Sequence, residues 1–184
     1  MAKVPRRAVF LDRDGTILDD PGFLHEPDKA RLIPDAGRAI ARLNKAGWLV
    51  ITVTNQSGIG RGRYPESDYH AVQRRLSDLL RAYGARLDGS YFCPHYPPVN
   101  GPCDCRKPGT KMFHEAREAL GIDFGRSWWV GDRVTDVAPA RELGGSSVLV
   151  LTGNGTLHQG QARAMGAEVV QDLGAAVAMI LTTE

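Results

Sequence analysis

Near its N-terminus the chain reads Ala8-Val9-Phe10-Leu11-Asp12-Arg13-Asp14-Gly15-Thr16. The first four residues form a continuous apolar run, which is typical of a strand buried on both faces of a parallel sheet. Asp12 and Asp14 follow it directly and point to the same side while the chain stays extended. Carboxylates this close repel each other unless a cation or a shared proton lies between them. A helix–loop–helix calcium site is excluded, because its sixth and twelfth loop positions hold Ile17 and Phe23 instead of Gly and Glu.

Size and composition indicate an ordinary globular protein. The chain has 184 residues, of which 42% are hydrophobic and 24% charged, and its formal net charge is +2. This length favours a single domain over residues 1–184, and the small charge does not favour nucleic-acid binding. The basic stretch 1–7 lacks a following export segment, and no apolar run approaches the roughly 20 residues of a membrane helix. We therefore expect a cytoplasmic monomer that binds neither nucleic acid nor membrane.

Helical and extended patterns alternate along the chain. Helical periodicity covers residues 35–46, 66–83, 113–120, 140–143 and 175–181. Short β-rich runs cover residues 8–11, 48–53, 91–92, 128–130, 148–151 and 169–170. This alternation predicts the α/β class, with a Rossmann-like parallel sheet and helices on both faces. Three strands end in polar residues (Asp12 with Asp14, Thr54 with Asn55, and Asp132), at the edge where such sheets bind ligands.

All three cysteines fall in one short loop, residues 93–105. Cys93-Pro94-His95 opens the loop and Cys103-Asp104-Cys105 closes it. Three thiolates and one imidazole form a complete tetrahedral zinc set with no position left for a reacting water. The alternatives are reduced cysteines without a metal, or one disulfide with a thiol left over, which a cytoplasmic setting disfavours. The loop therefore predicts a structural Zn²⁺ site.

Four ordered motifs resemble those of phosphatases of the haloacid dehalogenase (HAD) superfamily. They are Asp12-x-Asp14-Gly15-Thr16, Thr54-Asn55, Lys107 and Gly131-Asp132-x-x-x-Asp136. The resemblance implies a Rossmann-like sheet in which a tight turn and a β-hairpin flap, here about residues 15–30, follow the first strand. Many relatives carry a separate cap domain. This chain has no room for one, so we expect a capless member.

The resemblance also implies the chemistry of the site. Asp12 would attack phosphorus and form an aspartyl-phosphate, and Asp14 would act as general acid and then general base. Mg²⁺ bound by Asp12, the Asp14 carbonyl and Asp132 would neutralise charge, with Asp136 orienting that set without direct ligation. The hydroxyl of Thr54, the neighbouring amides and Lys107 would hold the phosphoryl oxygens.

The zinc loop makes the resemblance more specific within the HAD superfamily. It leads directly into Cys105-Arg106-Lys107-Pro108. This junction is similar to that of the D-glycero-D-manno-heptose 1,7-bisphosphate 7-phosphatase family and the related histidinol-phosphatases. In that setting Arg106 is suited to a second, non-reacting phosphate, because guanidinium binds phosphate through two parallel hydrogen bonds.

The flap and the segment after Thr54 favour the heptose group over the histidinol-phosphatases. Gly22-Phe23-Leu24-His25-Glu26 resembles its Gly-Tyr-x-His segment, although Phe23 lacks the usual hydroxyl and Arg133 stands where Lys is expected. The substrate contacts that the resemblance implies are Asp20, Phe23, His25, Asn55, Gln56, Ser57, Arg106 and Arg133.

The sequence thus predicts a Mg²⁺-dependent phosphatase that removes the 7-phosphate of the heptose bisphosphate. The alternatives are a histidinol-phosphate phosphatase, another sugar-phosphate phosphatase, a polynucleotide 3′-phosphatase, or a zinc-stabilised binding module without catalysis. The polynucleotide alternative needs a basic groove, whereas Arg61, Arg63, Arg74 and Arg75 are interpreted as a solvated face. The binding module is disfavoured because every motif carboxylate is present.

Overall fold

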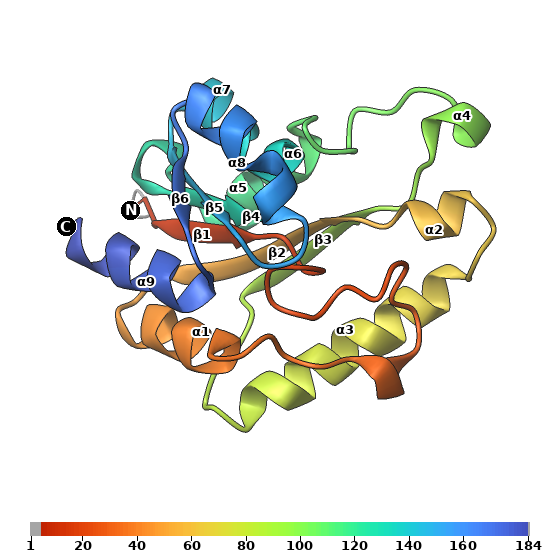
Figure 1. Ribbon diagram of the computed structural model, residues 1–184, viewed down its shortest axis with the longest axis horizontal. Helices are drawn as coiled ribbons and strands as arrows, with labels where there is room; N and C mark the ends of the chain where they lie inside the picture. Colours follow the sequence, from red (N-terminus) through yellow and green to blue (C-terminus); the bar gives the residue numbers. More distant parts are fainter. Residues whose placement is uncertain (1–4, 184) are drawn as a thin grey trace.

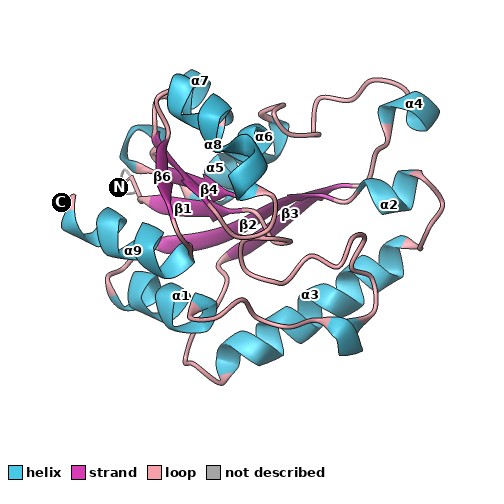
Figure 2. Cartoon of the chain, viewed as in Figure 1, coloured by secondary structure: helices cyan, strands magenta, loops and turns pink. Residues whose placement is uncertain are grey.

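The computed structural model describes residues 5–183, so residues 1–4 of the basic N-terminal stretch and residue 184 lie outside the described residues. The chain builds one six-stranded sheet in the order β3-β2-β1-β4-β5-β6, and every neighbouring pair is parallel (Figures 1 and 2). The strands are β1 (Ala8–Leu11), β2 (Leu49–Asn55), β3 (Gly89–Cys93), β4 (Trp128–Gly131), β5 (Ser146–Val150) and β6 (Glu168–Val170).

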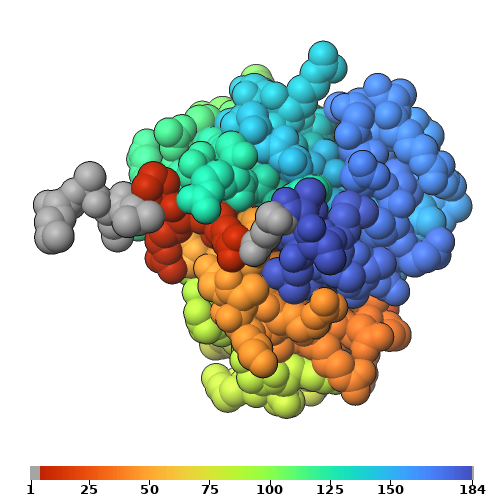
Figure 3. Space-filling model, turned by 90° about the vertical axis from the view of Figure 1, so that its left-hand side faces the viewer, coloured from red at the N-terminus to blue at the C-terminus, as the bar shows by residue number. Residues whose placement is uncertain are grey.

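Helices cover both faces of this sheet. One layer contains α1 (Ala36–Lys45), α3 (Glu66–Arg81) and α9 (Leu173–Thr182). The other contains α5 (Lys111–Leu120), α6 (Val134–Val137), α7 (Pro139–Leu143) and α8 (Gly155–Ala164). The C-terminal helix α9 packs against α1, as Figure 3 shows where the dark blue and orange segments meet.

Strand β1 lies in the interior of the sheet and contributes side chains to the hydrophobic cores on both of its faces. Val9 and Leu11 join the core on the α1–α9 side, and Ala8 and Phe10 join the core on the α5 side. Because successive side chains of a strand alternate between faces, a strand covered on both sides must be apolar throughout. The predicted fold class is therefore confirmed.

The helical content exceeds the prediction. The described chain adds α8, the short helices α2 (Ser57–Gly60), α4 (Pro97–Asn100) and α6, and single 3₁₀ turns at Pro27–Lys29 and Phe124–Arg126. Helix α8 gave no periodic signal because only Gly155 and Ala162 are buried in it, while Leu157 is 83% exposed. Within residues 5–183 no helix is both long and apolar enough to cross a membrane.

The segment after β1 differs from the expected hairpin. Within residues 15–30, all of them described, no strand is formed; isolated bridges instead link Leu18 to Asp14 and to Leu32. Gly15 has φ +86°, a left-handed conformation that favours glycine and lets the chain turn at once after Asp14. Ile17 and Leu18 are fully buried. The flap is thus a loop anchored at its base by apolar residues and not by a β-ladder.

Phe10 is expected to be the most sensitive position of the α5-side core. Its ring packs against Phe113 at 5.2 Å, Trp129 at 4.8 Å and Phe124 at 6.1 Å between centroids. Phe10→Ala should lower the free energy of unfolding by about 3–5 kcal/mol because it leaves a cavity among three rings. Urea denaturation measures this, with the exposed Leu157→Ala as control, which should change stability by less than about 0.5 kcal/mol. A loss below about 1 kcal/mol for Phe10→Ala would contradict this packing.

Candidate active site

The carboxyl ends of β1, β2 and β4 open into one cavity of about 750 Å³. Polar side chains from β1, the flap, β2, the zinc loop and the segment after β4 line it. The predicted site residues among them are Asp12, Asp14, Asp20, Phe23, Thr54, Asn55, Gln56, Ser57, Arg106, Lys107, Arg133 and Asp136. The topology therefore brings together residues that lie more than a hundred positions apart in the sequence.

A buried ammonium group joins two of the strand ends. Lys107 Nζ lies 2.9 Å from Asp12 Oδ1 and 2.8 Å from Asp136 Oδ1, and it also donates to the Val53 carbonyl. Burial disfavours the charged ammonium, but the two carboxylates outweigh it and raise the pKa of Lys107, which stays protonated. For Asp12, burial disfavours the charged carboxylate and raises its pKa to about 7, although the nearby Lys107 charge opposes that shift.

Asn55 and Asp136 hold this lysine in place. The Asn55 amide donates to the Lys107 carbonyl at 3.1 Å, and its oxygen accepts from the Lys107 backbone N–H at 2.9 Å. Asp136 Oδ2 accepts from the Arg133 backbone N–H at 2.9 Å, so both of its oxygens are engaged within the protein. Both side chains thus fix the position of Lys107 relative to Asp12.

Three carboxylates, those of Asp12, Asp132 and Asp136, offer oxygens within 4.8 Å of one another. Asp132 is fully buried, and its Oδ2 accepts from the Asn154 backbone and side-chain N–H groups at 2.7 and 3.2 Å. Its Oδ1 has no hydrogen-bond partner among residues 5–183. An unpartnered, buried carboxylate oxygen beside two other carboxylates is the donor set that a hard divalent cation such as Mg²⁺ prefers.

Asn154 and Gly153 were not predicted. Gly153, with φ +54°, passes so close that a Cβ there would lie 2.4 Å from Asp132 Oδ2. Their roles depend on a loop that follows β5, more than twenty residues after Asp132, so no local motif marks them.

The flap contacts the far side of the cavity. Asp20 Oδ2 lies 3.9 Å from Arg133 Nη2, and Phe23, at φ +56°, lies under the guanidinium of Arg63 at 4.2 Å. Arg61 stacks on Tyr96 at 3.6 Å and lines the cavity with Arg106 and Arg133. Arg61 and Arg63 are exposed, as the sequence predicted, but their guanidinium groups also lie over aromatic rings.

His25 does not reach the cavity lining. Its ring stacks on Tyr64, with 5.0 Å between centroids and 3° between planes, and its Nδ1 lies 2.8 Å from the Phe23 carbonyl. The structure therefore places His25 on the outer side of Tyr64, where it joins the flap to the segment after β2.

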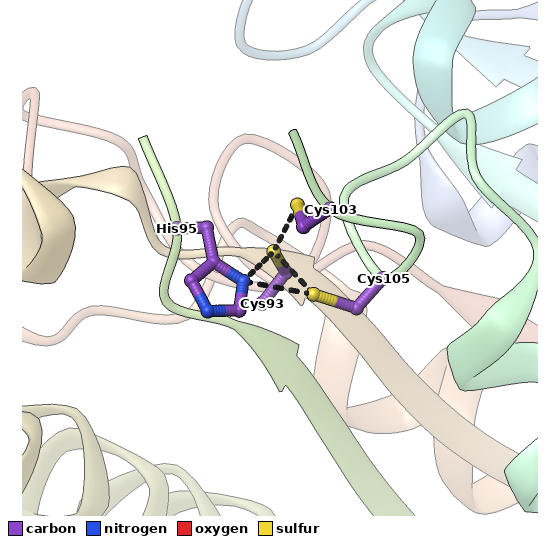
Figure 4. Close-up of side chains that lie close together, drawn as sticks. All are labelled: Cys93, His95, Cys103 and Cys105. Atoms are coloured by element: carbon purple, nitrogen blue, oxygen red, sulfur yellow. Dashed lines mark hydrogen bonds between the residues drawn. The ribbon is translucent and has the colours of Figure 1, made fainter. Parts of the chain in front are cut away.

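The four predicted zinc ligands converge (Figure 4). Cys93 Sγ lies 2.8 Å from Cys105 Sγ and 3.8 Å from Cys103 Sγ, and His95 Nδ1 lies 3.2 Å from Cys105 Sγ. All four donor atoms lie within 4.8 Å of one another, and the three cysteines are free of disulfides within the described chain. This donor set fits one tetrahedral metal ion, and the disulfide alternative is wrong.

Comparison with known proteins agrees with this geometry. The profile of the HAD-hydrolase-like family matches residues 104–176. A D-glycero-beta-D-manno-heptose-1,7-bisphosphate 7-phosphatase of Haemophilus ducreyi is 41% identical over 86% of this chain and 91% of its own length. That of Pseudomonas aeruginosa is 38% identical over 96% and 98% of the two chains.

Solved structures give the same answer. The D,D-heptose 1,7-bisphosphate phosphatase of B. bronchiseptica, complexed with magnesium and phosphate, superposes with a TM-score of 0.89 at 33% identity. The superposition covers 97% of this chain and 99% of that one. The corresponding phosphatase of Burkholderia thailandensis gives a TM-score of 0.74 at 32% identity, over 96% and 99% of the chains.

Fold and site together define a haloacid dehalogenase-like hydrolase. Within that class, the similarity over most of its length shows that the chain belongs to the family of D-glycero-D-manno-heptose 1,7-bisphosphate 7-phosphatases.

Cation binding at the carboxylate cluster should depend on pH. Since the pKa of Asp12 is raised to about 7, its carboxyl is protonated below that pH and must lose the proton when a cation binds. The Mg²⁺ dissociation constant should therefore rise by roughly tenfold per pH unit as the pH falls below about 7, and level off above it. Titration calorimetry measures this; an affinity that stays constant from about pH 5 to about pH 8 would contradict the assignment of the Asp12 pKa.

Proposed function

We propose that this chain hydrolyses the 7-phosphate of D-glycero-D-manno-heptose 1,7-bisphosphate through an aspartyl-phosphate on Asp12. Family membership supports the reaction class. The choice of substrate rests on one observation about the cavity. It is lined by the Asp12–Lys107 ion pair and also by three guanidinium groups, those of Arg61, Arg106 and Arg133. A bisphosphate supplies an anion to each end.

In the first half of the reaction, Asp12 attacks phosphorus and the ester P–O bond breaks. Asp14 donates its proton to the departing sugar oxygen. In the second half Asp14 takes a proton from water, which attacks the aspartyl-phosphate and releases inorganic phosphate with Asp12 restored. The Thr54 hydroxyl, nearby backbone N–H groups and Lys107 stabilise the equatorial phosphoryl oxygens, where negative charge collects.

Asp12, the Asp14 carbonyl and Asp132 would hold Mg²⁺, and Asp136 would orient this set through Lys107. When bound, the ion supplies positive charge that allows an anionic nucleophile to approach an anionic phosphate. Cys93, His95, Cys103 and Cys105 would hold Zn²⁺, which fixes the path of the chain into Arg106 and Lys107. Reduced cysteines of this kind suit a cytoplasmic enzyme, and we propose that it acts as a monomer on a small sugar phosphate.

Removal of the nucleophile should abolish activity. Asp12→Asn should lower kcat on the heptose bisphosphate by a factor on the order of 10⁴ or more, because the amide cannot form the acyl-phosphate. Phosphate release measures this. The matched control is Asp78→Asn on the exposed face of α3, which should keep wild-type activity. Retained turnover in Asp12→Asn would mean that another residue attacks phosphorus.

Both anomers of the heptose bisphosphate and histidinol phosphate should be assayed side by side. Histidinol phosphate has a cationic amine in place of the second phosphate, so the three arginines should disfavour it by at least about tenfold in kcat/KM. Equal or better turnover of histidinol phosphate would favour the sister activity.

Loss of the metal from the zinc loop should lower the stability of the fold more strongly than the rate of the reaction. Cys105→Ser should remove about one zinc per chain and lower the thermal midpoint, because a closed metal site contributes directly to folding. Elemental analysis and thermal melts of Cys105→Ser and of the wild-type protein measure this. Full metal content in the variant would show that the cluster does not bind as proposed.

A further inference from the structure

Gln56 lies between β2 and α2, directly beside the residues to which the reaction is assigned. Its side chain is 3% exposed and makes four hydrogen bonds. The amide nitrogen donates to Asp14 Oδ2 at 2.8 Å and to Thr54 Oγ1 at 2.9 Å. The amide oxygen accepts from the Tyr64 hydroxyl at 2.8 Å and from Arg13 Nη2 at 3.2 Å.

These contacts use the whole capacity of the side chain. A primary amide has two N–H donors and an oxygen with two acceptor positions, and all four have partners within the protein. Gln56 therefore has nothing left for a substrate hydroxyl or phosphate. This differs from the substrate contact that its position after Thr54-Asn55 predicts.

The orientation of the amide is determined by its neighbours. Arg13 can only donate and the Asp14 carboxylate can only accept, so nitrogen and oxygen cannot exchange places. Burial raises the pKa of Tyr64 to about 12, so its hydroxyl keeps the proton that it donates to Gln56. The Tyr64 ring is itself fixed, because it is stacked under His25 and a Cβ at Gly58 would lie 2.1 Å from it.

Asp14 is held by three N–H groups in total. Arg13 Nε donates to Oδ1 at 2.9 Å, and Arg13 Nη2 donates to Oδ2 at 2.9 Å beside the bond from Gln56. Arg13 is fully buried and cannot easily move, and the Asp14 side chain keeps 17% exposure on the cavity wall. Of the roughly four acceptor positions of a carboxylate, three are occupied, and the open one is on Oδ1.

We propose that Gln56, oriented by Tyr64, is the positioning residue for the general acid and base Asp14, and that Oδ1 is the oxygen that exchanges the proton. The proposal rests on the function assigned above. Oδ1 gives its proton to the sugar oxygen as the P–O bond breaks, and it takes a proton from the water that attacks the aspartyl-phosphate. Because Gln56 also donates to Thr54 Oγ1, it leaves the Thr54 hydroxyl proton free to bind a phosphoryl oxygen.

The dependence of the rate on the leaving group tests this. A sugar or other alkyl phosphate needs a proton on its leaving oxygen, whereas the nitrophenolate of p-nitrophenyl phosphate departs without one. We expect Gln56→Met to lower kcat/KM on alkyl phosphates by about 10- to 100-fold more than on p-nitrophenyl phosphate. Asp14→Asn should give the same pattern with a larger difference between the two substrates. Tyr64→Phe, which removes only the hydrogen bond to the Gln56 oxygen, should give a smaller difference.

Gln73→Met is the matched control, since Gln73 bonds to Ser90 Oγ at 2.8 Å, away from Asp14, and should leave both substrates unaffected. Equal losses on the two substrates, or a rise in KM alone, would overturn the proposal and make Gln56 a structural or substrate-binding residue. If Gln56→Met does not fold, the ratio measured for Tyr64→Phe decides. If the wild-type enzyme does not hydrolyse heptose bisphosphate, but Gln56→Met still loses more activity on other alkyl phosphates than on p-nitrophenyl phosphate, only the proposed substrate is contradicted.

Discussion

The site depends on a buried ammonium group placed between two buried carboxylates. Lys107 Nζ contacts Asp12 and Asp136 at 2.9 and 2.8 Å. Asp12 and Asp132 follow β1 and β4 directly, and Asp136 belongs to the short helix α6 after β4. Without a counter-charge, such a concentration of anions in a dry interior would be strongly unfavourable. One lysine offsets part of that charge, and Oδ1 of Asp132, which has no partner among residues 5–183, is free to accept a second cation. Three carboxylates against one ammonium leave this site short of positive charge, which an incoming phosphate also needs.

Two loops bring the cations to this sheet edge. The zinc loop follows β3 and returns through Cys103 and Cys105, so Arg106 and Lys107 leave it at a fixed point beside β2. The flap follows β1 and carries Phe23 against the arginines at the mouth. Without a cap domain, the edge of the sheet alone encloses only a small part of a bound substrate. Here, aromatic rings lie under Arg61 and Arg63, and the Cys93, His95, Cys103 and Cys105 side chains converge just before Arg106 in the chain. These contacts restrict the arginines in a protein that lacks a cap domain.

The sequence predicted those features whose signals are local. Buried strands, the carboxylates that follow them and four candidate metal ligands within thirteen residues can each be recognised in a short segment, and the parallel topology then brings the strand ends together. Helix α8 was missed because only two of its residues are buried. The hairpin expected in the flap came from the family resemblance, whereas this chain forms only isolated bridges there. The bonds of Gln56, the support of Asp132 by Asn154 and the stacking of Arg61 were missed for another reason. Each joins segments whose contact is set by tertiary packing, for which the individual residue types carry no signal.

The proposed reaction requires that the Asp12 carboxylate becomes covalently phosphorylated. The most direct test is to quench the enzyme during turnover, reduce the acyl-phosphate with borohydride and locate the modified residue by peptide mass spectrometry. The aspartate at position 12 should be converted to homoserine only when substrate is present, and no other acidic residue should change. Reduction at a different carboxylate, or none at all during confirmed turnover, would contradict it.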